Sequence, residues 1–282
     1  NEEIGVVATA ELENPRTDGD NSKPSVRKNE TALGNLITDG MLQKAKEYNS
    51  NVIMSLQNGG GIRAPINRGP ITVGEVITVL PFGNTLAVMD VTGEELKAAF
   101  EHSVRSYPIE NGGFLHVSSG VKVEFDSSKP AGERIVKITY TDAEGNVVEI
   151  KDHETYTIAT NAFTAKGGDG FDMFGKAYEE GRVTDLGLSD WENFRDYLVS
   201  LGETVTPTIE GRIVDVNTDS ENPTETISDM EFSGTTEEVK VYNGNVTVSV
   251  KDVTKFSNVH VKGNLVLTGN LQDEVSFSNI VV

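Results

Sequence analysis

The segment Gln57-Asn58-Gly59-Gly60-Gly61-Ile62-Arg63 places three consecutive glycines between an amide side chain and a permanent cation. Glycine tolerates positive φ angles and, because it has no side chain, lets a ligand approach its peptide groups. Such a loop suits a small polar or anionic ligand, held by main-chain N–H groups together with the guanidinium of Arg63. The alternative is an ordinary glycine-rich turn, which this motif alone does not exclude.

Two further markers strengthen the case for a binding site. Residues 161–171, Asn-Ala-Phe-Thr-Ala-Lys-Gly-Gly-Asp-Gly-Phe, form a second glycine cluster, and Leu80-Pro81-Phe82-Gly83 is a third marker. Short apolar runs over 51–56 and 155–160, which we interpret as strands, lead directly into the two glycine clusters. Several such loops in one chain favour a ligand site over isolated turns.

The composition excludes several classes of function. The chain has 282 residues, no cysteine and a formal net charge of −20. Disulfides, thiolate metal sites and a cysteine nucleophile are therefore absent. A strongly acidic chain is unsuited to wrapping nucleic acid or to binding anionic membranes, and no apolar run is long enough to span a bilayer. A small phosphorylated ligand remains possible, because an arginine pair acts at short range against a distant negative field.

The first 216 residues predict an α+β or mixed α/β domain, because helices and strands alternate with meanders. Thr72 with Glu75 and Thr92 with Glu95 are capping-box patterns that predict helix starts. Two further helices are expected over 31–48 and from Ser189 to Leu201. Strands are expected over 3–10, 51–56, 84–91, 121–125, 134–140, 146–150, 155–160 and 209–216.

The composition changes near Asp215. Residues 217–230 are rich in Asn, Thr, Ser, Glu and Pro and are interpreted as a linker. Residues 231–282 form short valine-rich strands with small turns between them, which predict either a β-solenoid or a small sandwich. The chain starts at Asn1 and ends in an apolar run, so we expect a piece of a longer protein and a truncated β-rich segment.

Four segments together carry a resemblance to a known family: Arg27 to Leu36 (Arg-Lys-Asn-Glu-Thr-Ala-Leu-Gly-Asn-Leu), Asn58 to Arg63, Leu80 to Gly83, and Gly167 to Phe171. Over residues 3–214 the chain resembles the C-terminal domain of the 5′-nucleotidase family, which includes UDP-sugar hydrolases and 2′,3′-cyclic-nucleotide phosphodiesterases. The resemblance implies mixed sheets with flanking helices, and a domain that binds the nucleoside part of a substrate. It also implies a separate N-terminal metallophosphoesterase domain that carries two divalent metal ions.

The resemblance assigns substrate-binding roles to Arg27, Asn58, Gly60, Arg63, Phe82, Phe163 and Asp169. Phe82 and Phe163 would stack on the base, although without the resemblance each ring is more simply explained as a core aromatic. Asp169 would accept hydrogen bonds from the ribose hydroxyls, while Arg27 and Arg63 would grip phosphate. Asn58 would bond a base edge or position its loop. Asn29 stands where the family often has a further arginine.

No catalytic or metal-ligating residue is expected in this chain. Its four histidines are scattered, and none of the family's Asp-x-His, Gly-Asn-His or Gly-His-x-His metal motifs occurs. His102 is interpreted as a packing residue, and Glu30 and Asn35 as structural groups at a helix start. We therefore expect the chain alone to bind nucleotide without hydrolysing it and without a cofactor of its own.

The leading hypothesis is the nucleotide-recognition domain of a secreted or surface-attached 5′-nucleotidase-type hydrolase, located in the periplasm or at the cell wall. An alternative is the same domain of a 2′,3′-cyclic-nucleotide 2′-phosphodiesterase with 3′-nucleotidase activity. Two others are a non-catalytic nucleotide-binding module and an adhesin that works through residues 231–282. The expected partners are a nucleotide or nucleoside and the metallophosphoesterase domain of the same chain, with no nucleic acid and no membrane insertion.

Overall fold

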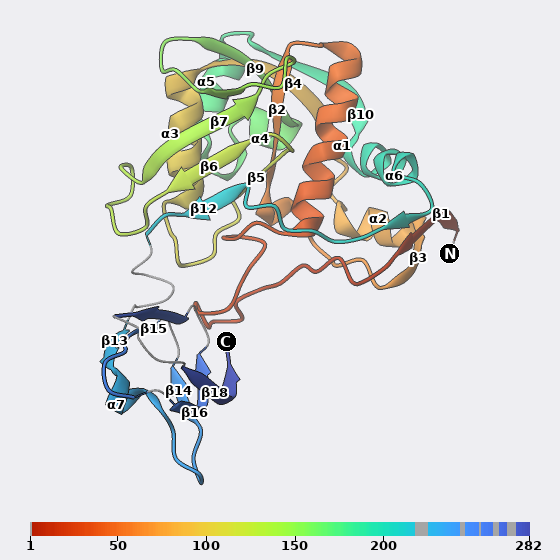
Figure 1. Ribbon diagram of the computed structural model, residues 1–282. Helices are drawn as coiled ribbons and strands as arrows, with labels where there is room; N and C mark the ends of the chain where they lie inside the picture. Colours follow the sequence, from red (N-terminus) through yellow and green to blue (C-terminus); the bar gives the residue numbers. More distant parts are fainter. Residues whose placement is uncertain (1, 218–224, 243–245, 254, 262–264, 270–274) are drawn as a thin grey trace. The chain divides into compact units, whose positions relative to one another are not determined.

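The computed structural model describes residues 2–217, 225–242, 246–253, 255–261, 265–269 and 275–282 (Figure 1). The chain divides into two units, Asn1–Val216 and Asn217–Val282. Each is described by itself below, beginning with the first unit, which contains the markers singled out in the sequence.

A five-stranded mixed sheet forms the centre of the first unit, in the order β10-β4-β9-β2-β5. Its strands are β2 (Val52–Asn58), β4 (Thr85–Thr92), β5 (Leu115–Val117), β9 (Thr155–Asn161) and β10 (Val183–Ser189). β2 and β9 run parallel, whereas β4 is antiparallel to β9 and β5 is antiparallel to β2. The carboxyl ends of β2 and β9 therefore lie at the same edge as the starts of β4 and β5.

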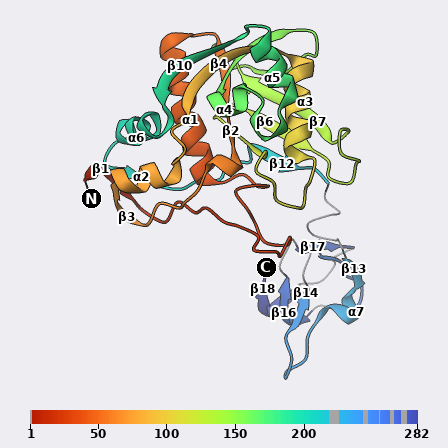
Figure 2. The ribbon, with the colours of Figure 1, turned by 180° about the vertical axis from the view of Figure 1, so that it is seen from behind.

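Helices cover both faces of this sheet, and alternation along β4 shows how. Leu86 and Val88 belong to one buried cluster, while Ala87 and Met89 belong to another. This is the two-residue period of a strand buried on both faces. The first cluster includes α1 (Ala32–Tyr48), α2 (Val73–Val79) and α6 (Asp190–Ser200); the second includes α3 (Gly93–Val104) and α5 (Asp172–Glu179). Figure 2 shows α1 and α6 on one side of the sheet and α3 and α5 on the other.

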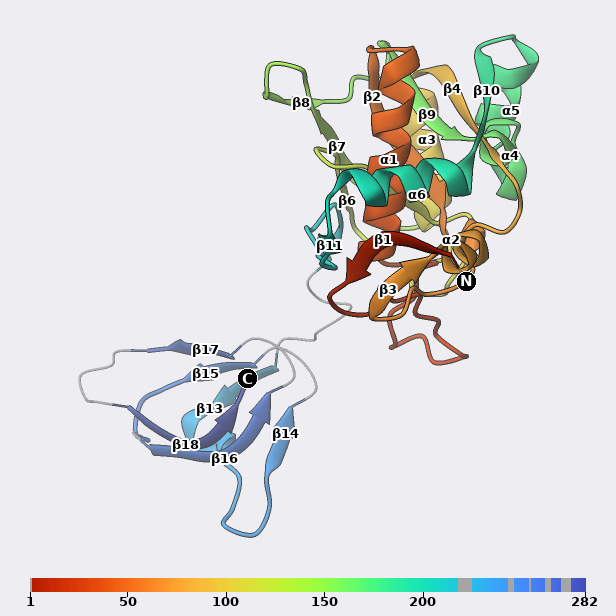
Figure 3. The same cartoon turned by 90° about the vertical axis from the view of Figure 1, so that its right-hand side faces the viewer.

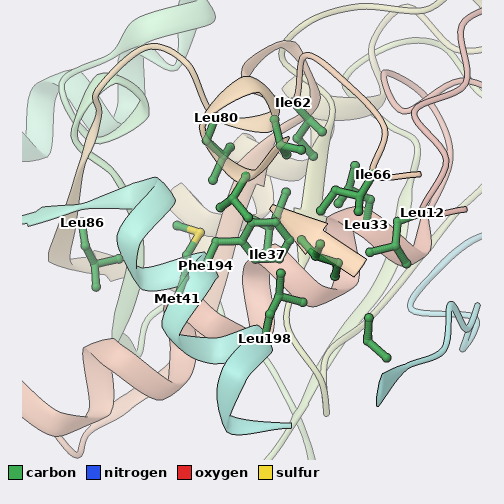
Figure 4. Packing of buried hydrophobic residues seen from close by; sticks show 14 of the residues in the cluster. Leu12, Leu33, Ile37, Met41, Ile62, Ile66, Leu80, Leu86, Phe194 and Leu198 are labelled. Atoms are coloured by element: carbon green, nitrogen blue, oxygen red, sulfur yellow. The ribbon is translucent and has the colours of Figure 1, made fainter. Parts of the chain in front are cut away.

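The first cluster depends on helical spacing that the sequence already displays. Leu33, Ile37 and Met41 follow one another along α1, and they meet Phe194 and Leu198 of α6 (Figure 4). The cap of α1 is Thr31, whose side chain accepts a hydrogen bond from the Gly34 amide. Both expected capping boxes, at α2 and α3, are formed.

Two smaller sheets complete this unit. One has the order β11-β1-β3 (Thr204–Val205, Glu3–Ala8, Gly69–Thr72), and the other has the order β12-β6-β7-β8 (Ile213–Asp215, Lys122–Phe125, Ile135–Thr141, Val147–Glu149). The expected strand 209–216 is shorter, because the amides of Glu210 and Arg212 donate to the carboxylate of Glu30 rather than to a neighbouring strand. β3, β5, α5, β10 and β11 had not been predicted.

The second unit is a parallel β-solenoid over its described residues (Figure 3). Its strands are β13 (Glu225–Ser228), β14 (Lys240–Tyr242), β15 (Val246–Ser249), β16 (Lys255–Val261), β17 (Leu265–Thr268) and β18 (Ser276–Val281). Odd-numbered strands pair in one parallel sheet and even-numbered strands in another. Consecutive strands thus alternate between the sheets, the pattern of a solenoid and not of an antiparallel sandwich.

The predicted linker is too long at its C-terminal end. Its last residues, 225–230, form β13 and the start of α7 (Asp229–Phe232); residues 218–224 lie outside the described residues. Asp229 holds this segment to the next coil of the solenoid. Its Oδ2 accepts hydrogen bonds from the amides of Lys251, Asp252 and Val253.

Candidate nucleotide-binding site

The three predicted markers meet at one edge of the central sheet. The glycine loop continues from β2 as the short helix η1 (Gly59–Gly61), and β9 continues into α4 (Ala162–Ala165) and η2 (Gly168–Gly170). The register places Leu86 opposite Asn161 and Leu115 opposite Asn58, so the loops before β4 and β5 arrive at the same place. Carboxyl ends of neighbouring strands in α/β sheets are where ligand crevices form.

A cavity of about 470 Å³ opens at this edge. It is lined by Arg27, Asn58, Gly60, Gly61, Arg63, Phe82, Asn84, Gly112, Phe163 and Asp169. The fold therefore brings together all seven residues to which the sequence assigned binding. Gly61, Asn84 and Gly112 were not singled out, although Asn84 directly follows the Phe82-Gly83 marker and Gly112 belongs to a glycine pair.

Two aromatic rings face this cavity, and we call them the base end. Phe82 is 62% exposed and Phe163 is 45% exposed, so neither is a core aromatic. The Phe163 ring packs against Gly168, where an added Cβ atom would come within 2.6 Å of the ring. The guanidinium carbon of Arg63 lies 5.8 Å from the Phe82 ring centroid. Exposed rings held in this way present a free apolar surface to a ligand.

Three main-chain N–H groups of the glycine loop donate to carbonyls of the protein itself. The amides of Gly59 and Gly60 donate to the carbonyls of Phe114 and Gly112, at 2.7 and 2.9 Å. The Arg63 amide likewise donates to Val79, at 2.9 Å. These three amides are therefore bonded within the fold, which differs from the expected use of the loop's main-chain N–H groups. Instead the glycines allow close packing: an added Cβ on Gly60 would lie 3.0 Å from the Gly112 Cα.

Two arginines, which we call the anion end, give the cavity a local positive charge. No carboxylate lies within ion-pair distance of Arg27 or Arg63 among the residues described. Arg16, by contrast, forms a bidentate pair with Glu110, at 2.8 and 3.1 Å. Asp169 also lines this cavity, but neither guanidinium forms an ion pair with a carboxylate among the described residues, an arrangement suited to an anionic ligand.

The pKa directions agree with that charge distribution. Burial, together with the charges of Arg16 and Arg63, lowers the pKa of Arg27, whose Nε atom is buried without a partner among the described residues. The hydrogen bonds of Arg16 and Ser25 lower the pKa of Glu110 to about 2. Glu110 therefore neutralises Arg16 but leaves Arg27 available to a ligand.

Asp169 stands on η2 in a left-handed conformation, with φ +57°. Its Oδ2 accepts a hydrogen bond of 2.8 Å from the side-chain Nδ2 of Asn58, the one hydrogen bond to this carboxylate within the described part of the chain. The side-chain Oδ1 of Asn58 is also engaged, since it accepts a hydrogen bond from Asn161 Nδ2 at 2.9 Å. Asn58 is only 4% exposed, so its amide serves to orient Asp169 before any ligand arrives.

Two residues near Asp169 were not recognised as part of this region. His102 Nε2 lies 2.8 Å from the Asp169 carbonyl oxygen, and its ring packs edge-on against Phe171 at 4.8 Å. Arg105 Nη1 donates to the His102 carbonyl. No sequence signal pointed to either residue, because α3 approaches η2 only in the folded chain.

Glu30 and Asn35 have the structural role expected of them. Asn35 Nδ2 donates to Glu30 Oε1 at 2.7 Å, and the other Glu30 oxygen accepts from the Arg212 amide. The contact ties the start of α1 to residues 208–212, and not to the Arg27 segment alone.

No group of three or more His, Asp or Glu side chains suited to a metal ion occurs within the described ranges. The same residues contain no helix with the length and apolar character needed to cross a membrane.

A family model described as the C-terminal domain of 5′-nucleotidase matches residues 6–176. The trifunctional nucleotide phosphoesterase protein YfkN of Bacillus subtilis is 43% identical over 199 residues, which are 70% of this chain and 13% of that protein. The snake venom 5′-nucleotidase of Gloydius brevicauda is 37% identical over 200 residues, 67% of this chain and 33% of that protein. The chain thus spans a third or less of the length of these relatives.

A crystal structure of a 5′-nucleotidase precursor from Thermus thermophilus matches with a TM-score of 0.67 and 45% identity. The match covers 77% of this chain and 40% of that one. It confirms the predicted fold class, mixed sheets with flanking helices, and the family resemblance carried by the four motifs. This chain belongs to the family of the 5′-nucleotidase C-terminal domain.

Proposed function

We propose that this chain is the nucleotide-recognition part of a 5′-nucleotidase-type phosphoesterase. One observation supports this above the others. Two exposed phenylalanines and two arginines without a carboxylate partner among the described residues line the same cavity. A ligand that is flat and aromatic at one place and anionic at another fits that combination, and a nucleotide is such a molecule.

Six of the ten lining residues have tasks that their chemistry allows. Phe82 and Phe163 stack on the base, a contact worth about 1–3 kcal/mol per ring. Asp169, oriented by Asn58, accepts hydrogen bonds from the ribose hydroxyls. Arg27 and Arg63 bind the phosphate oxygens and remain charged at any working pH.

Hydrolysis would require a metal site on another part of the whole protein. A pair of divalent ions supplies a nucleophilic hydroxide and stabilises charge on the phosphoryl group. We propose that an N-terminal metallophosphoesterase domain holds those ions. In this scheme the present chain contributes binding and orientation of the nucleotide, with its phosphate turned toward the metal-bearing partner.

Location is also part of the proposal. Snake venom enzymes occur among the relatives, and an acidic chain without cysteine suits an extracellular setting. We propose a secreted or cell-surface protein, or a periplasmic one.

Calorimetric titration of the 282-residue chain with adenosine, AMP and UDP-glucose tests the binding role. All three ligands should bind, and AMP should bind more tightly than adenosine. Phe82→Ala and Phe163→Ala should each weaken all three by about tenfold. Unchanged affinities in both variants would overturn the assignment of the rings.

A second titration addresses the kind of phosphate ester. The Bacillus relative is named a trifunctional nucleotide phosphoesterase, a name that does not single out a 5′-phosphate, so the 2′,3′-cyclic and 3′-phosphate alternatives are tested beside it. Comparing AMP with 3′-AMP and 2′,3′-cyclic AMP shows which phosphate position Arg27 and Arg63 favour. Incubation of the chain with AMP and Mg²⁺ or Mn²⁺ should release no phosphate above the blank, and clear turnover would contradict the proposed division of labour.

A further inference from the structure

His116 lies in the middle of β5, opposite Gln57 of β2, and is completely buried. It does not line the cavity. Its Nε2 atom lies 2.7 Å from the carbonyl oxygen of Val26, the residue before Arg27. A carbonyl oxygen only accepts hydrogen bonds, so Nε2 carries the proton and donates it.

The other ring nitrogen has no partner within the described part of the chain. His116 Nδ1 is buried there without a hydrogen bond. It faces α1 at Gly34, where an added Cβ would come within 2.1 Å of Nδ1. Burial lowers the pKa of His116 to about 4, so the ring is neutral at physiological pH. The polar contact that the histidine makes is therefore with the Arg27 segment.

The second peptide group beside Arg27 is fixed from the same stretch of chain. The Asn111 amide donates to the Arg27 carbonyl at 3.0 Å. Both carbonyls that flank the Arg27 Cα are thus held by residues 111–116. On its other side the Val26 carbonyl packs against Gly59, where an added Cβ would lie only 2.3 Å from the oxygen.

Fixing both peptide planes fixes the direction of the Arg27 Cα–Cβ bond. This matters because, among the described residues, the guanidinium has no carboxylate partner and its Nε atom is unpaired. Because no ion pair orients the Arg27 side chain before an anion binds, its direction depends on the backbone. A side chain that rotates freely loses more entropy when it binds.

We infer that His116 is a positioning residue, which aims Arg27 at the phosphate of the ligand through the Val26 carbonyl. The inference rests on the proposed function, because it requires Arg27 to bind phosphate. It adds a residue outside the cavity to the machinery that distinguishes a nucleotide from a nucleoside. The base end should not depend on His116, because Phe82 and Phe163 belong to other segments, the turn after α2 and the helix α4.

The test compares the affinities for AMP and adenosine in three forms of the chain. His116→Leu removes the donor, leaves the Val26 carbonyl buried without a partner, and should weaken AMP about tenfold while adenosine changes less than about twofold. His116→Gln keeps an N–H donor at a similar reach, so it should retain the wild-type preference for AMP. Val117→Ala, at a neighbouring buried residue, controls for lost stability.

Each outcome separates the inference from the proposed function. Equal binding of AMP and adenosine by the wild-type chain would refute phosphate binding by Arg27, and the role of His116 with it. The inference alone would be overturned if His116→Leu kept the wild-type preference for AMP over adenosine. It would also be overturned if Val117→Ala reduced that preference as much as His116→Leu does. If the leucine variant does not fold, the ¹⁵N spectrum of the wild-type histidine decides: the Nε2–H tautomer is expected at pH 7, and an Nδ1–H tautomer would overturn it.

Discussion

The two ends of the cavity are built in opposite ways. At the base end, Phe82 and Phe163 are exposed; Phe82 follows α2 in a turn, and Phe163 lies on the short helix α4. At the anion end, the backbone on both sides of Arg27 is bonded to a buried strand and its preceding loop. The base end thus resembles a surface added to the fold, whereas the Arg27 part of the anion end is continuous with the core. Substitutions at the base end should therefore change ligand affinity without changing the stability of the fold. Substitutions at the anion end should change both.

The largest expected effect compares an aromatic that faces the cavity with one that lies behind it. Phe171 is fully buried, packed against Phe174 at 5.5 Å and against His102. Phe171→Ala should lower the free energy of unfolding by about 3–5 kcal/mol, because it leaves a cavity. Phe163→Ala should lower it by less than about 1 kcal/mol, since the ring is already half exposed.

Urea unfolding of both variants measures the difference. Similar losses would show that the base end is part of the core after all, and the contrast between the two ends would disappear.

Acid provides the next test, because the anion end depends on a buried neutral histidine. The pKa of His116 is about 4 in the folded chain and about 6.5 when unfolded, so between these values the unfolded chain binds more protons. The stability contributed by the neutral ring is complete above pH 6.5 and is lost as the pH falls toward 4. The loss should approach about 3 kcal/mol.

His116→Gln removes this dependence, so its free energy of unfolding should gain on that of the wild type as the pH falls from 7 to 4. Asp190 works in the opposite direction, because burial raises its pKa to about 6 and its protonation stabilises the folded chain as the pH falls. That contribution is common to both forms and cancels in the comparison. A constant difference across the range would show that His116 does not titrate as described.

Arg27→Ala should produce the largest change in ligand preference. Loss of a charged hydrogen-bond donor to phosphate costs about 2 kcal/mol, or about a 30-fold loss of AMP affinity, while adenosine affinity should stay within about twofold. Arg68→Ala is the matched control, because it makes the same change in net charge at an exposed position outside the cavity. Equal losses in the two variants would mean that AMP senses only the net charge.

The sequence alone located the cavity because its markers occupy strand ends. The glycine loop follows β2 and the second cluster follows β9, and parallel strands bring their carboxyl ends to one edge. The sequence could not show in the same way that amides of the glycine loop donate to carbonyls of the protein itself. The partners of Gly59 and Gly60 are carbonyls in residues 112–114, and only the pairing of β2 with β5 brings them together.

The second unit shows a different limit. Three copies of one motif, Phe232-Ser-Gly, Phe256-Ser-Asn and Phe277-Ser-Asn, recur at unequal spacing, which hid the repeat. The structure stacks them: Phe256 pairs with Phe277, and the side chain of Asn279 donates to that of Asn258 at 2.7 Å. Short valine-rich runs predict strands in a solenoid and in a sandwich alike. Only the parallel pairing of the strands, which the structure shows, distinguishes the two architectures.

The smallest expected effect concerns the place where the two ends meet. Arg63 belongs to the anion end, yet its guanidinium carbon lies 5.8 Å from the Phe82 ring centroid. An exposed cation–π contact is worth about 0.5–1 kcal/mol. Arg63→Lys keeps the charge but loses the planar group, so a double-mutant cycle with Phe82→Ala should give a coupling of that size in AMP binding. If the two changes in AMP binding free energy are strictly additive, the ring and the guanidinium act on the ligand separately. No contact between the base end and the anion end would then contribute to binding. A coupling well above about 1 kcal/mol would instead mean that Phe82 is aimed by Arg63, and that the base end is less independent of the anion end than its exposure indicates.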